Sequence, residues 1–334
     1  MNHRNLGRVR HACLLLLACL ATALAFPALA AAQDGGGDWR YGVIDSTDDP
    51  AGATRLGASW TRLRFQWAEV QADGPDSWDP PIDDEALETE LNDGRLVVGL
   101  LIGIPDWARD RDKLPEGLYL PHTDPDNTWA VFVREAVSRY EGQIDHWIIW
   151  NEPDIDDPAA LGHTWDGTAE DFAQLLRVAY LVAKDTNPDA VVHLGAYTYF
   201  WDETYFSRFL DILMADPQAA GNHYYFDVAT AHLYFQPERI FDVINAFRDD
   251  MTSRRLSKPI WLVETNAPPA DDSYWLVDDW TLNVTLYEQA AFIPQAIASA
   301  LAAGADRVAV YKLQDVPGDR DANPEPFGLL RQDN

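Results

Sequence analysis

The sequence predicts an α/β fold, namely a (β/α)8 TIM barrel. The main observation is that short apolar runs alternate with longer amphipathic runs, and that eight of the short runs can be counted. The rival fold, an open doubly wound sheet, normally has a glycine-rich phosphate loop after its first strand, and none follows residues 41–44. No boundary divides residues 41–334, so we expect one domain there, preceded by a flexible glycine-rich leader at residues 33–40.

Each short apolar run has the length of a β-strand. The predicted strands are Tyr41–Ile44, Trp60–Phe65, Leu96–Ile102, His146–Trp150, Ala190–Gly195, Phe226–Ala231, Pro259–Glu264 and Arg307–Leu313. Helices fill the gaps, and the clearest are Thr128–Tyr140, Ala169–Thr186, Tyr205–Ala215, Glu238–Met251 and Leu286–Ala303. Thr168, followed by acids in the next turn, marks one helix start, because a capping hydroxyl and negative charge stabilise that end.

The last helix of the barrel has no counterpart in the sequence. After the eighth predicted strand only a short segment remains, ending in Phe327–Asn334. A complete barrel needs a further helix to cover the space between strands eight and one. Two alternatives stay open: a shortened chain, or a barrel without its last helix in which an apolar gap is exposed.

Residues 1–32 have the pattern of a secretory signal peptide. Three arginines stand within the first ten residues, an apolar run extends from Cys13 to Phe26, and a small-residue cleavage pattern ends at Ala32. A membrane anchor is the alternative, but the apolar run is short and is stopped by Pro27. A lipoprotein anchor at Cys19 has too little apolar sequence before it. We therefore expect a secreted or periplasmic protein without membrane contact after cleavage.

Composition excludes several classes of partner and chemistry. A net charge of −29 argues against nucleic acid and anionic membranes. Both cysteines lie in the predicted signal peptide, so the mature chain has no disulfide or thiol chemistry. The eight histidines show no metal-binding spacing, and we expect neither a metal nor a cofactor. The acidic run Asp154–Asp157 lacks the glycine of a calcium loop and predicts a solvated face. The oligomeric state is not determined by the sequence.

Two of the predicted strands have a glutamate at or just after their carboxyl end. The fourth is followed by Asn151-Glu152-Pro153, and the seventh ends at Glu264. Because the carboxyl ends of barrel strands face one cleft, we expect these two side chains to converge. A carboxylate pair is the minimum equipment for breaking a glycosidic bond. The alternatives are an ion-paired loop acid at Glu152 and a helix cap at Glu264.

Further candidates fall at the same strand ends. Arg62 and Arg64 share a face of the second strand, and the sequence leaves open which of them points inward and which makes a structural ion pair. His232 and Tyr234 share a face at the end of the sixth strand. Thirteen tryptophans are many for this length, and indole packs on the apolar faces of sugar rings. The candidates for lining a cleft are Trp107, Trp275 and Trp280.

These motifs resemble the retaining glycoside hydrolases of clan A, which are barrels with catalytic glutamates after strands four and seven. Pro105–Ala108 and Phe327–Leu330 are most similar to family 39 and its relatives. The resemblance implies that Glu152 is the general acid/base and Glu264 the nucleophile. It further implies supporting roles, in which Arg62 lowers the pKa of Glu264, Tyr234 orients Glu264, His232 bonds Glu152 or the sugar, and Asn151 binds the sugar 2-hydroxyl.

One position departs from the clan. A tryptophan often follows strand eight, under the sugar, whereas Tyr311-Lys312 stands here. Lys312 can bind an acidic sugar or offset the acidic cleft. The resemblance thus implies a secreted retaining β-glycosidase that hydrolyses oligo- or polysaccharides by double displacement and needs no cofactor. A barrel that binds carbohydrate without cutting it is the alternative, and transglycosylation is a third possibility.

Overall fold

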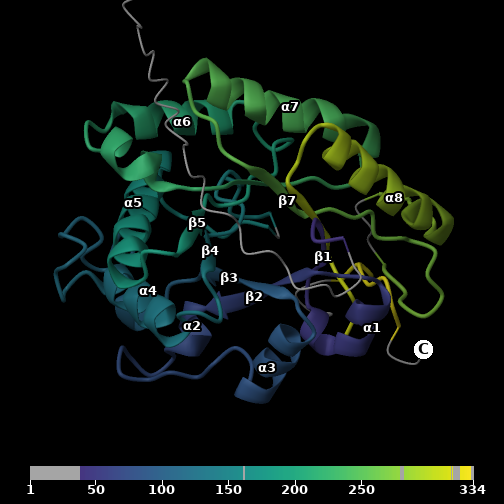
Figure 1. Cartoon of the computed structure of the whole chain (residues 1–334), viewed down its shortest axis with the longest axis horizontal. Coiled ribbons are helices and arrows are strands. Elements are labelled where there is room, and N and C mark those ends of the chain that lie inside the picture. Colours follow the sequence, from purple (N-terminus) through teal and green to yellow (C-terminus); the bar gives the residue numbers. More distant parts are fainter. Residues whose placement is uncertain (1–37, 161, 279–281, 317, 319–323, 332–334) are drawn as a thin grey trace, which may run out of the picture. The chain divides into compact units, whose positions relative to one another are not determined.

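Eight parallel β-strands form the centre of the structure, a computed structural model, and helices surround them (Figure 1). The structure describes residues 38–160, 162–278, 282–316, 318 and 324–331. The predicted signal peptide, the first part of the leader and Trp280 lie outside the described residues. The predicted (β/α)8 fold class is confirmed, and every strand lies on its expected apolar run.

The strands form two parallel four-stranded halves, in the orders β1-β8-β7-β6 and β2-β3-β4-β5. Two seams close the barrel. Parallel bridges from His193 to Val228 and from Tyr197 to Ala231 join β5 to β6, and the amide of Ser59 donates to the Tyr41 carbonyl at 2.9 Å between β1 and β2. The strand bounds are β1 Tyr41–Val43, β2 Trp60–Gln66, β3 Leu96–Ile102, β4 His146–Ile149, β5 Val191–His193, β6 Ala229–His232, β7 Ile260–Glu264 and β8 Arg307–Val310.

The α-helices begin and end close to their expected residues. Thr168 caps α5 in a capping box with Asp171, and Thr285 caps α8 in the same way with Glu288, so each pair satisfies two backbone amides of the helix start. The helix bounds are α1 Pro50–Arg55, α2 Trp67–Val70, α3 Asp84–Asn92, α4 Thr128–Arg139, α5 Ala169–Thr186, α6 Tyr205–Ala215, α7 Pro237–Ser253 and α8 Leu286–Ala302.

Buried tryptophans fill much of the layer between strands and helices. Trp67 stacks on Phe132 of α4, with ring centroids 4.9 Å apart, and Trp147 of β4 packs edge-on against Phe65 at 5.3 Å. A Cβ atom at Gly99 would lie 2.4 Å from the Trp147 ring. Glycine at this position of β3 therefore leaves the space that the indole occupies.

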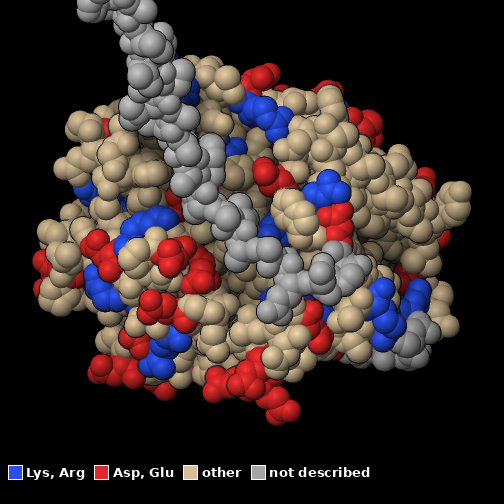
Figure 2. Space-filling model, in the orientation of Figure 1, with Lys and Arg blue, Asp and Glu red and all other residues tan. Residues whose placement is uncertain are grey.

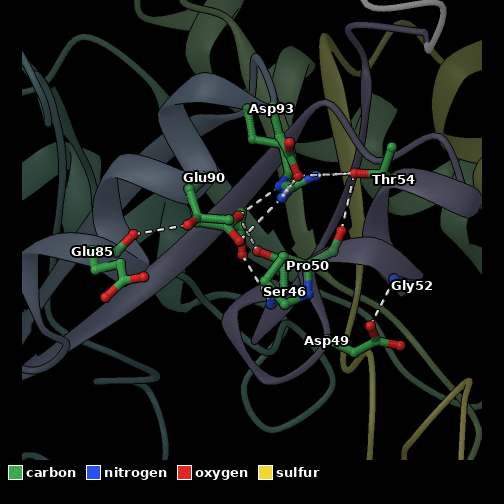
Figure 3. A network of polar contacts seen from close by, with 11 residues as sticks. Ser46, Asp49, Pro50, Gly52, Thr54, Glu85, Glu90 and Asp93 are labelled. Atoms are coloured by element: carbon green, nitrogen blue, oxygen red, sulfur yellow. Dashed lines mark hydrogen bonds and ion pairs between the residues drawn. The ribbon is translucent and has the colours of Figure 1, made fainter.

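A buried polar network ties the elements on both sides of the β1–β2 seam together (Figure 3). Glu90 of α3 accepts from the Ser46 hydroxyl at 2.5 Å and from Arg95 at 2.6 Å. Arg95 also donates to Thr54 of α1 at 2.7 Å and to Asp93 at 2.6 Å. Ser46 follows β1 and Arg95 precedes β3. The network therefore stabilises the barrel at the seam where β1 and β2 share few backbone hydrogen bonds.

The segment after β8 packs beside β1 without forming a helix among the described residues. No α-helix follows β8 among the described residues up to 331. Leu329 and Leu330 pack instead on a small core of Val43, Ala53 and Leu313. The apolar side chains of this small core are therefore buried, and not exposed as the second alternative had it. None of the helices in the described ranges combines the length and apolarity that a bilayer crossing requires.

Candidate active site

The turn after β4 carries Glu152 on a strained backbone. Trp150 and Glu152 have φ angles of 73° and 48°, a left-handed region that costs such residues on the order of 1–3 kcal/mol. Two contacts hold this conformation: the Glu152 amide donates to the Ala196 carbonyl at 3.0 Å, and the Trp150 indole donates to Thr164 at 3.1 Å. The turn directs the Glu152 carboxylate towards His232 of β6.

Glu264, the last residue of β7, carries a buried and fully paired carboxylate. Its Oε1 lies 2.5 Å from Nη1 of Arg62, and the two side chains are only 8% and 7% exposed. Its Oε2 accepts a hydrogen bond from the Tyr234 hydroxyl at 2.5 Å. A buried charge needs such partners, because an unpaired ion in the barrel interior is strongly unfavourable.

His232 lies between the two glutamates. Its Nδ1 is 2.7 Å from Oε1 of Glu152 and 3.4 Å from Oε2 of Glu264. One ligand atom of each of these three residues lies within 4.8 Å of the others. The two carboxylates, which are 112 residues apart in the sequence, therefore face one gap. Retaining glycosidases have a separation of about 5–5.5 Å, against about 6.5–9.5 Å in inverting ones.

The neighbours of Glu264 keep it ionised. Burial opposes ionisation, but the positive charges of His232 and Arg62 and the Tyr234 hydrogen bond outweigh it and lower the pKa of Glu264 below its ordinary value of 4.5. Burial and the charge of Glu264 raise the pKa of Tyr234 well above 10, so its hydroxyl stays a donor. The nucleophile role implied by the resemblance requires this protonation pattern.

Tyr311 and Lys312 follow β8 near this cluster, and Tyr311 is close enough to act electrostatically on Arg62 and Tyr234. Lys312 is 1% exposed and its Nζ is 3.9 Å from Asp45. The charge of Asp45, together with that of Glu264, raises the pKa of Arg62 against the effect of burial. Lys312 is thus placed to support the charge network from within the barrel, and its ammonium does not reach the open cleft described next.

An open cleft of about 650 Å³ adjoins the cluster at the carboxyl ends of β2, β3 and β4. Trp107 lines this cleft and is 37% exposed, with its indole nitrogen fixed to the Gln71 carbonyl at 2.7 Å. Asn151 lies half-buried beside it, its backbone paired with Ala196. Trp275 does not line the cleft; its indole donates to Pro324 at 2.9 Å. Trp280 lies outside the described residues.

Two expectations from the sequence are wrong. Asp154 does not belong to a solvated face, because it is 2% exposed and accepts from the amide and hydroxyl of Thr198 at 2.9 and 2.8 Å. Burial, reinforced by the charge of Glu152, raises its pKa to about 6. Arg64 makes no structural ion pair among the described residues; it is exposed, lines the cleft and donates to Gln66 at 3.1 Å.

Sequence reasoning also missed much of the cleft wall. Apart from Gln66 at the end of β2, its further polar and aromatic members come from the loops after β3 and β4, where the sequence shows no periodic pattern. The only available signal was the clustering of basic and aromatic residues after Pro105. These members are Gln66, Asp106, Arg109, Lys113, His163, Thr164, Trp165 and Asp166.

The trio of Glu152, His232 and Glu264 also has the donor types of a metal site. However, both oxygens of Glu264 already face Arg62 and Tyr234, and a guanidinium 2.5 Å away repels a cation. The arrangement therefore fits a paired anion better than a metal ligand.

Comparison with known proteins identifies the fold. No protein-family model matches the sequence, and no curated protein matches it. Solved structures do match. A family 39 glycoside hydrolase from the gut symbiont Bacteroides cellulosilyticus has a TM-score of 0.64 at 16% identity, over 90% of this chain and 61% of that one. A monomeric β-xylosidase from Caulobacter crescentus has a TM-score of 0.61 at 14% identity, over 88% and 64%.

A shorter enzyme matches over most of its length. An endoglucanase from the hyperthermophilic Thermotoga maritima has a TM-score of 0.58 at 13% identity, over 87% of this chain and 92% of that one. The chain spans less than two thirds of the family 39 enzyme and of the xylosidase. At these identities the likeness shows the fold: the chain has the barrel of family 39 glycoside hydrolases and their relatives, as its motifs suggested.

Proposed function

We propose that this protein is a retaining β-glycosidase that hydrolyses oligo- or polysaccharides. The observation that carries the proposal is the geometry of two carboxylates from β4 and β7, which face one gap within 4.8 Å of His232 and of each other. Their surroundings differ in the way that the mechanism needs. Glu264 is buried and held ionised by Arg62, whereas Glu152 is more exposed and receives no contact from that cation among the described residues.

In the first step the Glu264 carboxylate attacks the anomeric carbon, and the bond to the leaving oxygen breaks. Glu152 gives its proton to that oxygen, so the leaving group departs neutral and a glycosyl ester of Glu264 remains. In the second step Glu152 takes a proton from water, whose oxygen attacks the same carbon and frees Glu264. Two inversions give net retention.

Asn151, Tyr234 and His232 have supporting roles in this proposal. Tyr234 fixes one oxygen of Glu264 and leaves the carboxylate oriented for attack. His232 holds Glu152 at 2.7 Å and so fixes the proton donor. Asn151 adjoins the acid and is placed to bond a sugar hydroxyl, a contact that strengthens as positive charge develops on the ring.

A screen of chromogenic aryl glycosides tests the proposal. On any active substrate, Glu264→Gln should lower kcat by about 10³-fold or more, while the exposed Glu141→Gln should not change it. Glu152→Gln should lose the first step for poor leaving groups and keep much of the initial burst of dinitrophenol release from dinitrophenyl glycosides, because a good leaving group needs no proton. Steady-state turnover should fall for both, because the second step loses the base that takes a proton from water. Wild-type rates in Glu264→Gln, or inverted product anomers by NMR, would contradict the mechanism.

The activities of proteins with similar structures support the substrate class. They include a β-xylosidase, an exo-β-1,4-mannosidase and a complex with a mannose–N-acetylglucosamine disaccharide. We therefore extend the proposal to a carbohydrate partner without naming the sugar. We also propose export, guided by residues 1–32; mass spectrometry of the mature chain from its host tests this through the position of its first residue.

The second candidate function is carbohydrate binding without cleavage. The buried Lys312 at the place where the clan often has a tryptophan favours it. Calorimetric binding of an oligosaccharide, with no product from a broad glycoside panel, would select this candidate. Product analysis at high acceptor concentration separates hydrolysis from transglycosylation.

A further inference from the structure

The cleft beside the carboxylates gathers basic side chains in a strongly acidic protein. The chain has 25 Lys and Arg against 54 Asp and Glu, and Figure 2 shows acidic side chains along the lower edge of this face, over α3. Within the cleft this balance is reversed. Its charged lining residues are Arg64, Arg109, Lys113, Asp106 and Asp166, with His163 beside them.

Two of these cations have no acidic partner among the residues that the structure describes. Lys113 and Asp166 neutralise each other at 2.9 Å. Arg64 and Arg109 are exposed and form no ion pair among the described residues. One neutral oxygen holds each guanidinium: Gln66 accepts from Arg64 at 3.1 Å, and the Ile104 carbonyl accepts from Arg109 at 2.8 Å. Each arginine therefore keeps further N–H donors that a ligand can use.

The cleft lies next to the residues of the proposed reaction. Arg62 and Arg64 lie on the same face of β2, about 6.6 Å apart along the strand, and Arg62 touches Glu264. On the other side Thr164 lines the cleft and donates to the Asn151 carbonyl at 2.5 Å, next to Glu152. A sugar in this cleft would thus neighbour the sugar whose bond is cut.

We propose that the cleft binds a sugar unit that carries an anionic group, either a carboxylate or a sulfate ester. The inference rests on the proposed function, because it places one chain of sugars across both the cleft and the carboxylate pair. Trp107, fixed in orientation and half-exposed, packs on the apolar face of the ring. Arg64 and Arg109 pair with the anion, since the planar guanidinium donates two parallel hydrogen bonds to such groups.

If these arginines had only a structural role, we would expect them to form different contacts. Cations that only offset the acidic net charge would form ion pairs with aspartate or glutamate, as the exposed Arg139 does with Glu135 at 2.6 Å. Arg64 and Arg109 instead bond to neutral oxygens and face the cleft. Their placement fits an anion that arrives with the ligand.

Calorimetry with matched oligosaccharides tests the proposal. The ligands are xylo-, gluco- and mannotetraoses, each in a neutral, a uronic-acid-bearing and a sulfated form, titrated into Glu264→Gln protein to prevent turnover. For at least one backbone the anionic form should bind about 10- to 100-fold more tightly than the neutral one. The preference should weaken at high salt, and the better of the two anionic forms identifies the group.

Charge-removing variants locate the effect. Arg64→Gln with Arg109→Gln, added to the same protein, should abolish the preference, while the exposed Arg111→Gln, which does not line the cleft, should keep it. Both cleft arginines are exposed, so the melting temperature should be unchanged. Equal affinity for neutral and anionic ligands, or a preference that survives the double change, would overturn the subsite and leave the proposed function standing. Failure of every tetraose to bind would overturn both.

Discussion

Replacing Tyr234 by phenylalanine removes one of the contacts that hold Glu264 ionised. The hydroxyl donates to Oε2 over 2.5 Å, and the acceptor side chain is only 8% exposed. A hydrogen bond to a charged group contributes about 1.5–3 kcal/mol, so Tyr234→Phe should lower the free energy of unfolding at pH 7 by about that amount. Urea denaturation measures the loss.

The loss should depend on pH with a definite sign. The pKa of Glu264 in the folded protein lies below 4.5, so its pairing stabilises the fold above that pH and the stabilisation is lost as pH falls through the folded pKa. The difference between wild type and Tyr234→Phe should therefore be largest at neutral pH and shrink in acid. On an active substrate, the acid limb of kcat/KM should move to higher pH.

Tyr197→Phe is the matched control. Tyr197 is 1% exposed and its hydroxyl has no hydrogen-bond partner in the described part of the chain. We expect a loss below about 0.5 kcal/mol there. A Tyr234→Phe loss that is constant with pH, or no larger than that of Tyr197→Phe, would refute the claim that this hydroxyl stabilises an ionised Glu264.

Three further predictions concern neighbouring features. Burial raises the pKa of Asp154 from its ordinary value of 3.8 to about 6. The free energy of unfolding of the wild type should therefore fall by up to about 3 kcal/mol as pH rises between these two values. Asp154→Asn should not show this fall in stability, whereas Asp157→Asn should still show it. Gly99→Ala should cost about 1–3 kcal/mol by thermal melting, because its Cβ would meet Trp147 at 2.4 Å; Gly221→Ala, which meets nothing within 4 Å, should stay within about 0.5 kcal/mol. Overnight chelation with EDTA should leave both melting temperature and turnover unchanged, since Arg62 occupies the carboxylate that a cation would need; recovery of lost activity by added zinc or calcium would show that the trio binds metal.

The local sequence pattern was sufficient to predict the helices and strands. An apolar run that ends in polar residues identifies a strand wherever it packs, and Thr168 caps α5 through contacts within its own turn. The positions of Glu152 and Glu264 at strand ends followed from the same patterns. The C-terminal segment did not, because Leu329 and Leu330 follow no helical or strand period and find their place only against Val43 and Leu313.

The sequence by itself determined the strand order along the chain, the helix starts and the two acids at strand ends, because each depends on neighbours within a few residues. Strand alternation places Arg62 and Arg64 on one face, and only the family resemblance favoured Arg62; the tertiary structure shows the physical difference. Their depth in the barrel separates them: the first meets Glu264 in the interior and the second opens onto the cleft. It also decided that Asp154, in an acidic run, is buried against Thr198. The burial and the pairing of these side chains depend on residues that are far apart in the sequence. They could therefore be assigned only from the closed barrel.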